Sequence, residues 1–203
     1  MTRSRTFLFA TNNRDKFDDL GLVFKRLGIG LKQVPLEVKE GADSLLENAR
    51  LKAVETSKKY PGEVVIASDG GVIIPYLGDN WNYVLTKRLG GLDMDENFNE
   101  RRRAEAMLEL MKDAKGKDRK IFWRGAVVLA QDGQVIWSKV LEGTGGYLME
   151  SLPKKFDSRG FWLGYIWYVP EAKTYYMDIP VEKRFKYSSF KQRLYRGLEG
   201  IIK

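Results

Sequence analysis

The stretch FLFATNNRDKFDDL, residues 7–20, changes abruptly from an apolar run to polar and basic residues. Thr11, Asn13, Arg14 and Lys16 stand at the change, where the pattern predicts that a buried strand gives way to a helix. A helix N-terminus exposes unpaired N–H groups and the positive end of the helix dipole, so it is a natural anion site. Thr11 and Asn13 can donate to phosphate oxygens, and Lys16 adds a positive charge. The alternative is an ordinary helix cap, because Asn is a favoured N-cap residue.

A second candidate is ASDGG, residues 67–71. Asp69 stands at the end of a predicted buried strand, where α/β sheets commonly present the groups that handle ligands. Gly70 and the glycine after it would let a ligand or a metal ion approach the backbone closely. The alternative is a simple turn in which Asp69 bonds its own backbone.

A third candidate is KEGADSLLENARLKA, residues 39–53. Glu40 precedes a predicted helix, and Ser44 and Glu47 have the spacing of a capping box at its start. Asn48 and Lys52 are one helical turn apart, so we expect them to share a face of this helix.

Composition restricts the chemistry further, because the chain has no cysteine and no histidine. Thiolate chemistry, a histidine base and the usual zinc sites are therefore excluded, and oxygen ligands favour Mg²⁺, with Mn²⁺ as a second choice. The net charge of +8 indicates an anionic partner or a basic surface kept for solubility. The early apolar run is short and strand-like, so we expect no signal peptide, no membrane span and a cytoplasmic protein.

The elements that must position these residues are strands that alternate with helices in the first part of the chain and a pair of strands in a hairpin later. We predict helices over 15–27, 45–60, 80–91, 95–116 and 188–203. We predict strands over 6–10 and 31–38, a strand, glycine turn and strand over 63–78, a hairpin over 120–148 and a strand over 160–170. This order predicts an α/β fold, with residues 1–203 as a single domain built on a mixed sheet.

The three candidates, in this order, resemble the inosine triphosphate pyrophosphatases, also called non-canonical purine nucleoside triphosphate pyrophosphatases. That family has T-x-N-x-x-K, E-N-A-x-x-K-A and A-D-D-S-G-L motifs, which residues 11–16, 47–53 and 67–72 resemble. EGTGGYL at 142–148, RGFW at 159–162 and VEK at 181–183 are similar to its later segments. The resemblance therefore covers nearly the whole chain.

The resemblance implies a long, bent mixed sheet flanked by helices in two lobes with a central cleft, and a homodimer. It implies hydrolysis of a nucleoside triphosphate to a monophosphate and pyrophosphate, with Asp69 as the catalytic residue and Glu40 and Asp69 as ligands of Mg²⁺. The phosphates would be bound by Thr11, Asn13, Lys16 and Lys183, and further contacts with the substrate would come from Arg14, Lys52 and Gly70. Trp162, Tyr165 and Trp167 are candidates for stacking on the base, with ordinary packing in the sheet as the alternative.

Departures from the family pattern lie mainly in its later segments. Ser68 and Gly70 stand where the family has the first Asp and the Ser of A-D-D-S-G-L. No Asp matches the G-Y-D-P segment, and YSSFKQR replaces S-H-R. The motifs that handle the phosphates in the family are therefore retained, and those that handle the base are replaced. We expect inosine and xanthosine nucleotides as substrates, with a base selectivity that differs from the family's.

Two other functions stay open. One is a relative that binds nucleotides with little or no turnover, because the lost motifs cost catalysis. The other is a nucleic-acid-binding module, on a C-terminal helix that carries Lys186, Lys191, Arg193 and Arg196 with Phe190 and Tyr195. An amphipathic helix with Phe190, Leu194, Leu198 and Ile201 inward explains the same residues, so we do not expect nucleic acid as the partner.

Overall fold

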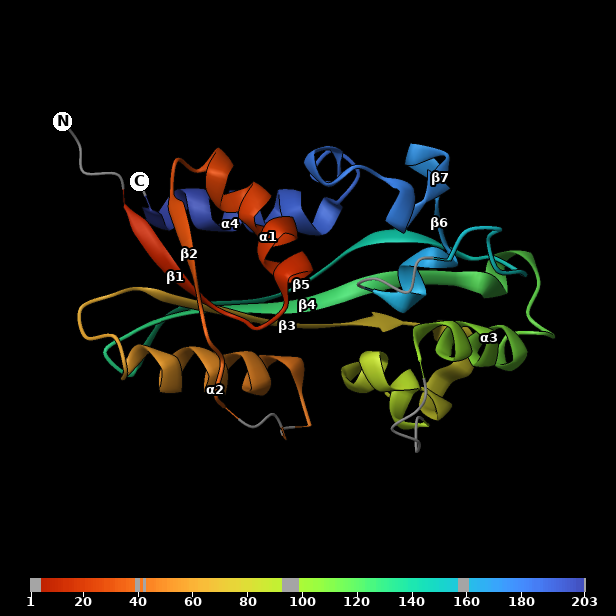
Figure 1. The fold of residues 1–203 in the computed structure, drawn as a ribbon, viewed down its shortest axis with the longest axis horizontal. Coiled ribbons are helices and arrows are strands. Elements are labelled where there is room, and N and C mark those ends of the chain that lie inside the picture. The colour runs from red at the N-terminus through yellow and green to blue at the C-terminus, as the bar shows by residue number, and fades with distance from the viewer. Residues whose placement is uncertain (1–4, 39–40, 42, 93–98, 157–160, 203) are drawn as a thin grey trace. The chain divides into compact units, whose positions relative to one another are not determined.

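The computed structural model describes residues 5–38, 41, 43–92, 99–156 and 161–202 of the 203. Within them the chain forms an α/β fold on one mixed sheet, with the strand order β2-β1-β3-β4-β5-β6-β7 (Figure 1). The strands are β1 Thr6–Ala10, β2 Gly30–Val34, β3 Val65–Ile73, β4 Lys120–Gln131, β5 Gln134–Leu148, β6 Trp167–Val169 and β7 Thr174–Tyr175. The α-helices are α1 Arg14–Arg26, α2 Leu45–Ser57, α3 Glu100–Leu110 and α4 Ser189–Ile202. None of the helices so described has the length and apolar character to cross a membrane.

The chain divides into two compact units. Unit 1 contains residues 1–70, 124–142 and 188–203, and unit 2 contains residues 71–123 and 143–187. Strands β3, β4 and β5 each contribute residues to both units.

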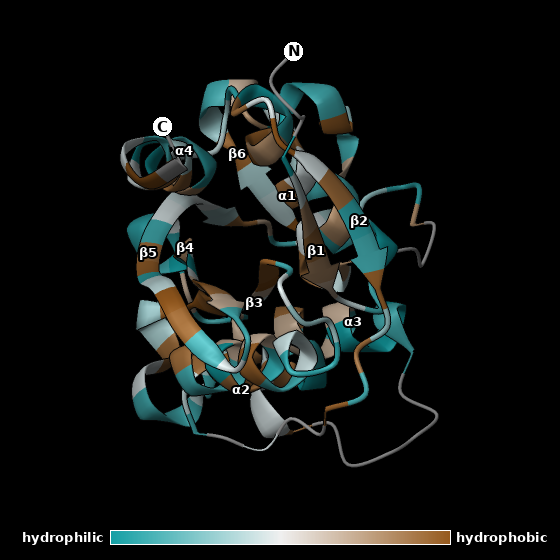
Figure 2. Cartoon of the chain, turned by 90° about the vertical axis from the view of Figure 1, so that its left-hand side faces the viewer, coloured by the Kyte–Doolittle hydropathy of each residue, from teal (hydrophilic) through white to brown (hydrophobic). Residues whose placement is uncertain are grey.

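Unit 1 is built around β1, which pairs in parallel with both β2 and β3. Figure 1 shows α1 and α4 on one side of these strands and α2 on the other. Figure 2 shows the contrast between hydrophobic β1 and the more hydrophilic edge strand β2. On α4, Lys191 is buried and its Nζ lies 2.8 Å from Asp19 Oδ2 of α1, so these two helices are fastened by an ion pair.

Unit 2 has a core rich in aromatic side chains. Trp81, Trp162 and Trp167 are each at most 5% exposed, and the Trp167 and Tyr176 rings stack with centroids 5.7 Å apart. Arg119 is also buried, and its guanidinium donates to the carbonyls of Met111, Ala114, Leu148 and Met149. Burial lowers the pKa of Arg119, but four carbonyl partners offset the desolvation of the charge.

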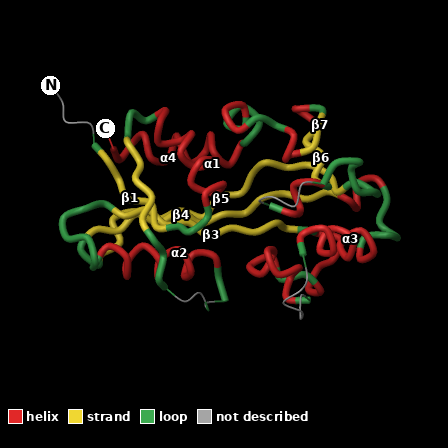
Figure 3. The backbone as a smooth tube through the Cα atoms, in the orientation of Figure 1, coloured by secondary structure: helices red, strands yellow, loops and turns green. Residues whose placement is uncertain are grey.

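The predicted glycine turn after Asp69 is wrong, because β3 continues through both glycines as one strand (Figure 3). Gly71 is needed for close packing instead. A Cβ at this position would lie 1.8 Å from the carbonyl oxygen of Tyr83.

Three further segments differ from the sequence prediction. The predicted strand over 160–170 contains a 3₁₀ turn, η4 Trp162–Tyr165, and only β6 is extended. Helix α3 is shorter than expected, and 80–91 is occupied largely by an irregular 3₁₀ segment, η2 Tyr83–Gly91. On α4, Phe190, Leu194 and Leu198 are buried as expected, whereas Ile201 is exposed.

Candidate active site

The end of β1 and the start of α1 form the first part of the candidate site. Thr11 is buried, and its Oγ1 accepts a hydrogen bond from Asn13 N at 3.1 Å. Asn13 is the N-cap of α1, and its Oδ1 accepts from Lys16 N at 3.0 Å. Asn13 therefore acts as the cap of α1. The same cap defines the helix N-terminus that the sequence predicts as an anion site.

Lys16 joins this helix to strand β3. Its Nζ donates to the carbonyl oxygen of Ser68 at 3.4 Å. The parallel register that pairs Leu8 with Val65 and Phe9 with Ile66 accounts for this approach. Continued by two residues, the register brings Thr11, just after β1, level with Ser68, which lies within β3.

Asp69 has its own lysine partner, from α2. Lys52 Nζ lies 3.4 Å from Asp69 Oδ1, and the two side chains are only 3% and 12% exposed. Ser44 starts this helix by accepting from Glu47 N, as the capping-box spacing predicted. Asn48 and Lys52 are both buried, which confirms that they share a face of α2. Since a buried ammonium group needs a counter-charge, the pair holds the Asp69 carboxylate in place.

Arg14, Gly70 and Glu40 were also predicted for this part of the site. The Arg14 side chain is 72% exposed and pairs with Asp18 rather than reaching β3. Gly70 follows Asp69 in the strand. Glu40 lies outside the described residues.

The remaining candidates belong to unit 2 and are described within it. Trp162 is 2% exposed in the aromatic core, and Tyr165 stacks on Phe156 with ring centroids 4.3 Å apart. Lys183 is exposed in the short 3₁₀ turn η7 Val181–Lys183. In the structure, Trp162 and Tyr165 therefore pack as ordinary interior residues of unit 2. Their contact with a base stays a prediction.

Oxygen donors near Asp69 fit a hard divalent cation. Such a cation keeps several waters and commonly needs only one or two carboxylates together with substrate phosphates. Asp69 offers such a carboxylate, since its side chain is partly exposed. No three acidic side chains gather among the described residues. The residues therefore fit a cation shared with a bound triphosphate.

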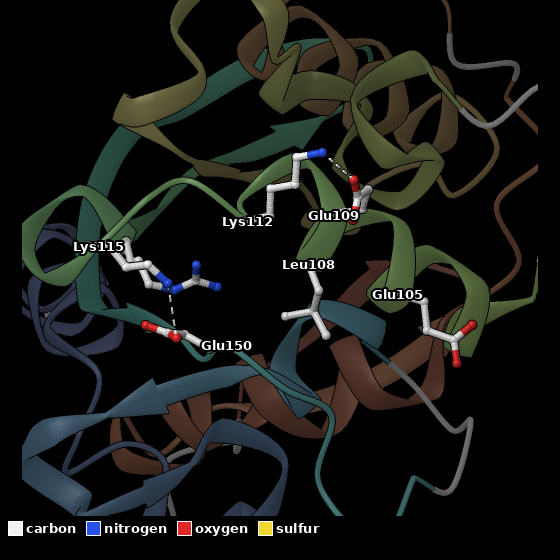
Figure 4. A pocket seen from close by; sticks show the side chains of 7 residues that line it. Glu105, Leu108, Glu109, Lys112, Lys115 and Glu150 are labelled. Atoms are coloured by element: carbon white, nitrogen blue, oxygen red, sulfur yellow. Dashed lines mark hydrogen bonds and ion pairs between the residues drawn. The ribbon is translucent and has the colours of Figure 1, made fainter.

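A surface hollow in unit 2 offers a contrast. It is lined by Glu105, Leu108, Glu109, Lys112, Lys115, Arg119 and Glu150 (Figure 4). Its charged side chains form ion pairs within the hollow, Lys112 with Glu109 at 2.7 Å and Lys115 with Glu150 at 3.3 Å. The hydrogen bond to Glu109 raises the pKa of Lys112. We therefore place the candidate site at β3 in unit 1.

Sequence reasoning treated Ser68 only as a departure from a motif. The structure shows that its backbone carbonyl is the acceptor for Lys16. Every residue has a backbone carbonyl, so the residue type at position 68 does not indicate this contact. Only the register of β1 against β3 could have indicated it.

Comparisons with known proteins agree with this placement of elements. The model of the Ham1 family matches residues 7–192. A dITP/XTP pyrophosphatase of Thermus thermophilus is 31% identical over 193 residues, which cover 93% of this chain and 87% of the relative. A dITP/XTP pyrophosphatase of Bacillus licheniformis is 29% identical over 160 residues, covering 76% and 77%. The solved structure of a HAM1 protein from Coxiella burnetii covers 98% of both chains with a TM-score of 0.74 and 19% identity, which supports the fold alone.

Proposed function

This chain belongs to the Ham1 family, and from that premise we propose that it hydrolyses nucleoside triphosphates to monophosphates and pyrophosphate. The substrates we propose are purine nucleotides with deaminated bases, namely ITP, dITP and XTP. One observation carries the proposal: Lys16 and Lys52 bring two ammonium groups to consecutive residues of β3, one of which is the carboxylate Asp69.

The proposed roles follow from position. Lys16 and Lys52 would bind the phosphates, because charge-assisted hydrogen bonds to phosphate oxygens are strong and cationic groups stabilise charge that grows in the transition state. Thr11, Asn13, Gly70, Arg14 and Lys183 would complete the phosphate contacts, and Trp162 and Tyr165 would contact the base.

Asp69 would orient the attacking water and accept its proton as the anhydride bond between the α- and β-phosphates breaks. Lys52 keeps this carboxylate in position before the substrate binds. A bound Mg²⁺ or Mn²⁺ ion, with Asp69 and the predicted Glu40 as ligands, would neutralise part of the phosphate charge. We also propose that the protein is cytoplasmic, that it is a single domain with a central cleft, and that it forms a homodimer. Light scattering after size exclusion tests the dimer.

The test is a panel of ITP, XTP, dITP, ATP, GTP, CTP and UTP with Mg²⁺, with pyrophosphate and orthophosphate resolved as products. We expect pyrophosphate and monophosphate in equal amounts. Orthophosphate as the main product would contradict the proposed reaction. Tight nucleotide binding without turnover would favour the non-catalytic relative. Salt-dependent oligonucleotide binding without turnover would favour the nucleic-acid module.

Removal of the cation is a second prediction. Activity should disappear in EDTA and return with Mg²⁺ or Mn²⁺, because the proposed ligands are carboxylates, which suit hard cations. Full activity in EDTA would remove the metal from the proposal.

A further inference from the structure

Strand β3 extends beyond the end of β1, its neighbour on one edge. Phe9 pairs with Ile66, and β1 ends at the next residue, Ala10. Residues 68–73 of β3, which include Asp69, therefore lie past the end of β1. The backbone of this stretch needs other hydrogen-bond partners along that edge.

Two side chains from a later segment take the place of β1 there. Thr86 Oγ1 accepts from Val72 N at 2.9 Å, and Trp81 Nε1 donates to the Val72 carbonyl oxygen at 2.7 Å. Backbone groups of every second residue in a strand point to the same edge, so Val72 shares the edge of Val64, whose carbonyl accepts from Leu8 N of β1. Both side chains are at most 5% exposed, so these bonds are shielded from water.

The clip is the segment that carries them, residues 81–90, most of which belongs to η2. A Cβ on Gly90 would lie 2.4 Å from Cε3 of Trp81, so the backbone of the clip packs directly on the indole ring. Leu89 has a φ angle of 49° and is 3% exposed. A leucine keeps this left-handed conformation only where its surroundings enforce it, so the clip is held in one shape.

The two glycines after Asp69 explain why the strand needs this support. Glycine has the greatest backbone freedom and weakens the interior of a strand. Gly70 and Gly71 stand between Asp69 and Val72, which the clip binds, and β1 holds β3 on the other side of Asp69, at Ile66. The carboxylate therefore belongs to a short length of strand that is fixed at both ends.

We propose that Thr86 and Trp81 are positioning residues for Asp69, an inference that rests on the proposed function. By engaging both backbone groups of Val72, they keep β3 extended past the two glycines. The strand then presents the Asp69 carboxylate in the geometry from which it accepts a proton from the attacking water.

Thr86→Val tests the hydroxyl group, because valine keeps the shape of the side chain and removes both of its hydrogen bonds. We expect kcat with ITP to fall by about ten- to a hundredfold, as for a small misplacement of a reacting group. Affinity for an inosine triphosphate analogue with a methylene between the α- and β-phosphates should not change, since the phosphate contacts remain. Thr86→Ser keeps the hydroxyl and should restore kcat. Wild-type kcat in Thr86→Val, or a loss of analogue affinity without a loss of kcat, would overturn the proposal.

Ser57 supplies a matched control at the end of α2. Its buried hydroxyl accepts from Gly133 N at 2.9 Å and donates to the Val54 carbonyl, three residues earlier, at 2.8 Å. Thr86 donates in the same way to the Tyr83 carbonyl, three residues earlier, at 2.7 Å. Ser57→Ala and Thr86→Val should therefore lower the urea midpoint similarly, because each leaves one backbone N–H without its acceptor. Only Thr86→Val should lower kcat, and equal losses of kcat in the two variants would overturn the proposal.

Trp81→Phe removes the second bond to Val72 and should also lower kcat. If Thr86→Val does not fold, wild-type kcat in folded Trp81→Phe would reject the proposal. Hydrogen exchange followed by mass spectrometry reports on the strand without turnover. Residues 69–71 should exchange faster in Thr86→Val and Trp81→Phe than in wild type, and at the wild-type rate in Ser57→Ala. Wild-type exchange in all three variants would contradict the role of the clip.

The two proposals fail separately. A wild-type protein that hydrolyses no triphosphate would reject the proposed function, while faster exchange of residues 69–71 in Thr86→Val would still support the hold of the clip on β3. Hydrolysis by the wild type that Thr86→Val and Trp81→Phe leave intact would reject the positioning role alone.

Discussion

Asp69 is the residue at which catalysis and folding should separate most clearly. Asp69→Asn keeps an oxygen that can accept from Lys52 Nζ but removes the basic carboxylate. Turnover should fall by about 10²- to 10⁴-fold, the usual contribution of a general base. Pyrophosphate release at saturating substrate measures the loss, and circular dichroism checks the fold.

Asp18→Asn is the matched control, because Asp18 is 41% exposed and pairs with Arg14. It should leave turnover unchanged. Near-normal turnover in Asp69→Asn would mean that this carboxylate serves only the strand and its lysine partner.

Lys16 should matter for phosphates and not for the nucleoside. Lys16→Ala removes a charge-assisted contact worth about 1.5–3 kcal/mol, so triphosphate affinity should fall by about ten- to a hundredfold. Inosine affinity should not change. Calorimetry with both ligands measures the difference, and the exposed Lys25 on the same helix supplies the control Lys25→Ala. Equal triphosphate affinity in Lys16→Ala and wild type would return Lys16 to an ordinary surface role.

At the scale of elements, β3 depends on the close packing of Gly71. A Cβ on Gly71 would lie 1.8 Å from the Tyr83 carbonyl oxygen, and Val72 N donates to Thr86 Oγ1 beside it. Gly71→Ala should therefore lower the free energy of unfolding by about 1–3 kcal/mol or more. Urea denaturation provides the measurement.

The matched control is Gly21→Ala, in α1. Apart from its chain neighbours and the backbone of α1, no atom of the described residues lies within 4 Å of a Cβ built on Gly21, so alanine should stabilise this helix by about 0.5–1 kcal/mol. Equal stability of the two alanine variants would show that the strand shifts to accept a methyl group at Gly71.

The elements that the sequence predicted best are those set by local signals. Asn13 and Ser44 accept the hydrogen bonds that start α1 and α2. Asp132 and Gly133 have positive φ angles, as a two-residue hairpin turn requires. The continuity of β3 was not predictable, because two consecutive glycines after an aspartate are locally typical of a turn, whereas here Gly71 lies within the strand and packs closely on Tyr83. Aromatic packing likewise turns Trp162–Tyr165 into a 3₁₀ segment within an apolar run that reads as a strand.

For the whole molecule, the main prediction concerns base selectivity. A pocket rejects a base when its buried polar groups stay unpaired, but aromatic faces stack on all bases similarly. The chain lacks the S-H-R and G-Y-D-P motifs, and the candidates Trp162 and Tyr165 are aromatic. We therefore expect kcat/KM for ITP and XTP to exceed that for ATP and GTP by less than about a hundredfold.

The measurement is kcat/KM for ITP and XTP against ATP, GTP, CTP and UTP. A preference for ITP and XTP of about a hundredfold or greater would contradict this expectation. It would also show that other groups read the deaminated base.

The proximity of Lys16 to Asp69 could be expected from the sequence, whereas the surroundings of Trp162 and Lys183 could not, for a physical reason. The parallel register places the end of β1 beside the middle of β3, so Lys16, which follows β1 in the sequence, lies close to Ser68 and Asp69. Nothing comparable relates Trp162 to a base or Lys183 to a phosphate, because their surroundings depend on packing within unit 2. Lys191 was counted among the basic residues of the C-terminal helix that could bind nucleic acid. This prediction is wrong, since its ammonium group is buried against Asp19.

The uneven placement of tryptophans gives the two units different optical signals. Of the five tryptophans, Trp137 alone belongs to unit 1, and the other four belong to unit 2. Three α-helices, α1, α2 and α4, belong to unit 1. In a Trp137→Phe variant, tryptophan fluorescence would therefore report on unit 2 alone, while most of the helical circular dichroism would come from unit 1. Two denaturation curves that coincide would mean that the units unfold together, and curves that separate would give each unit its own midpoint.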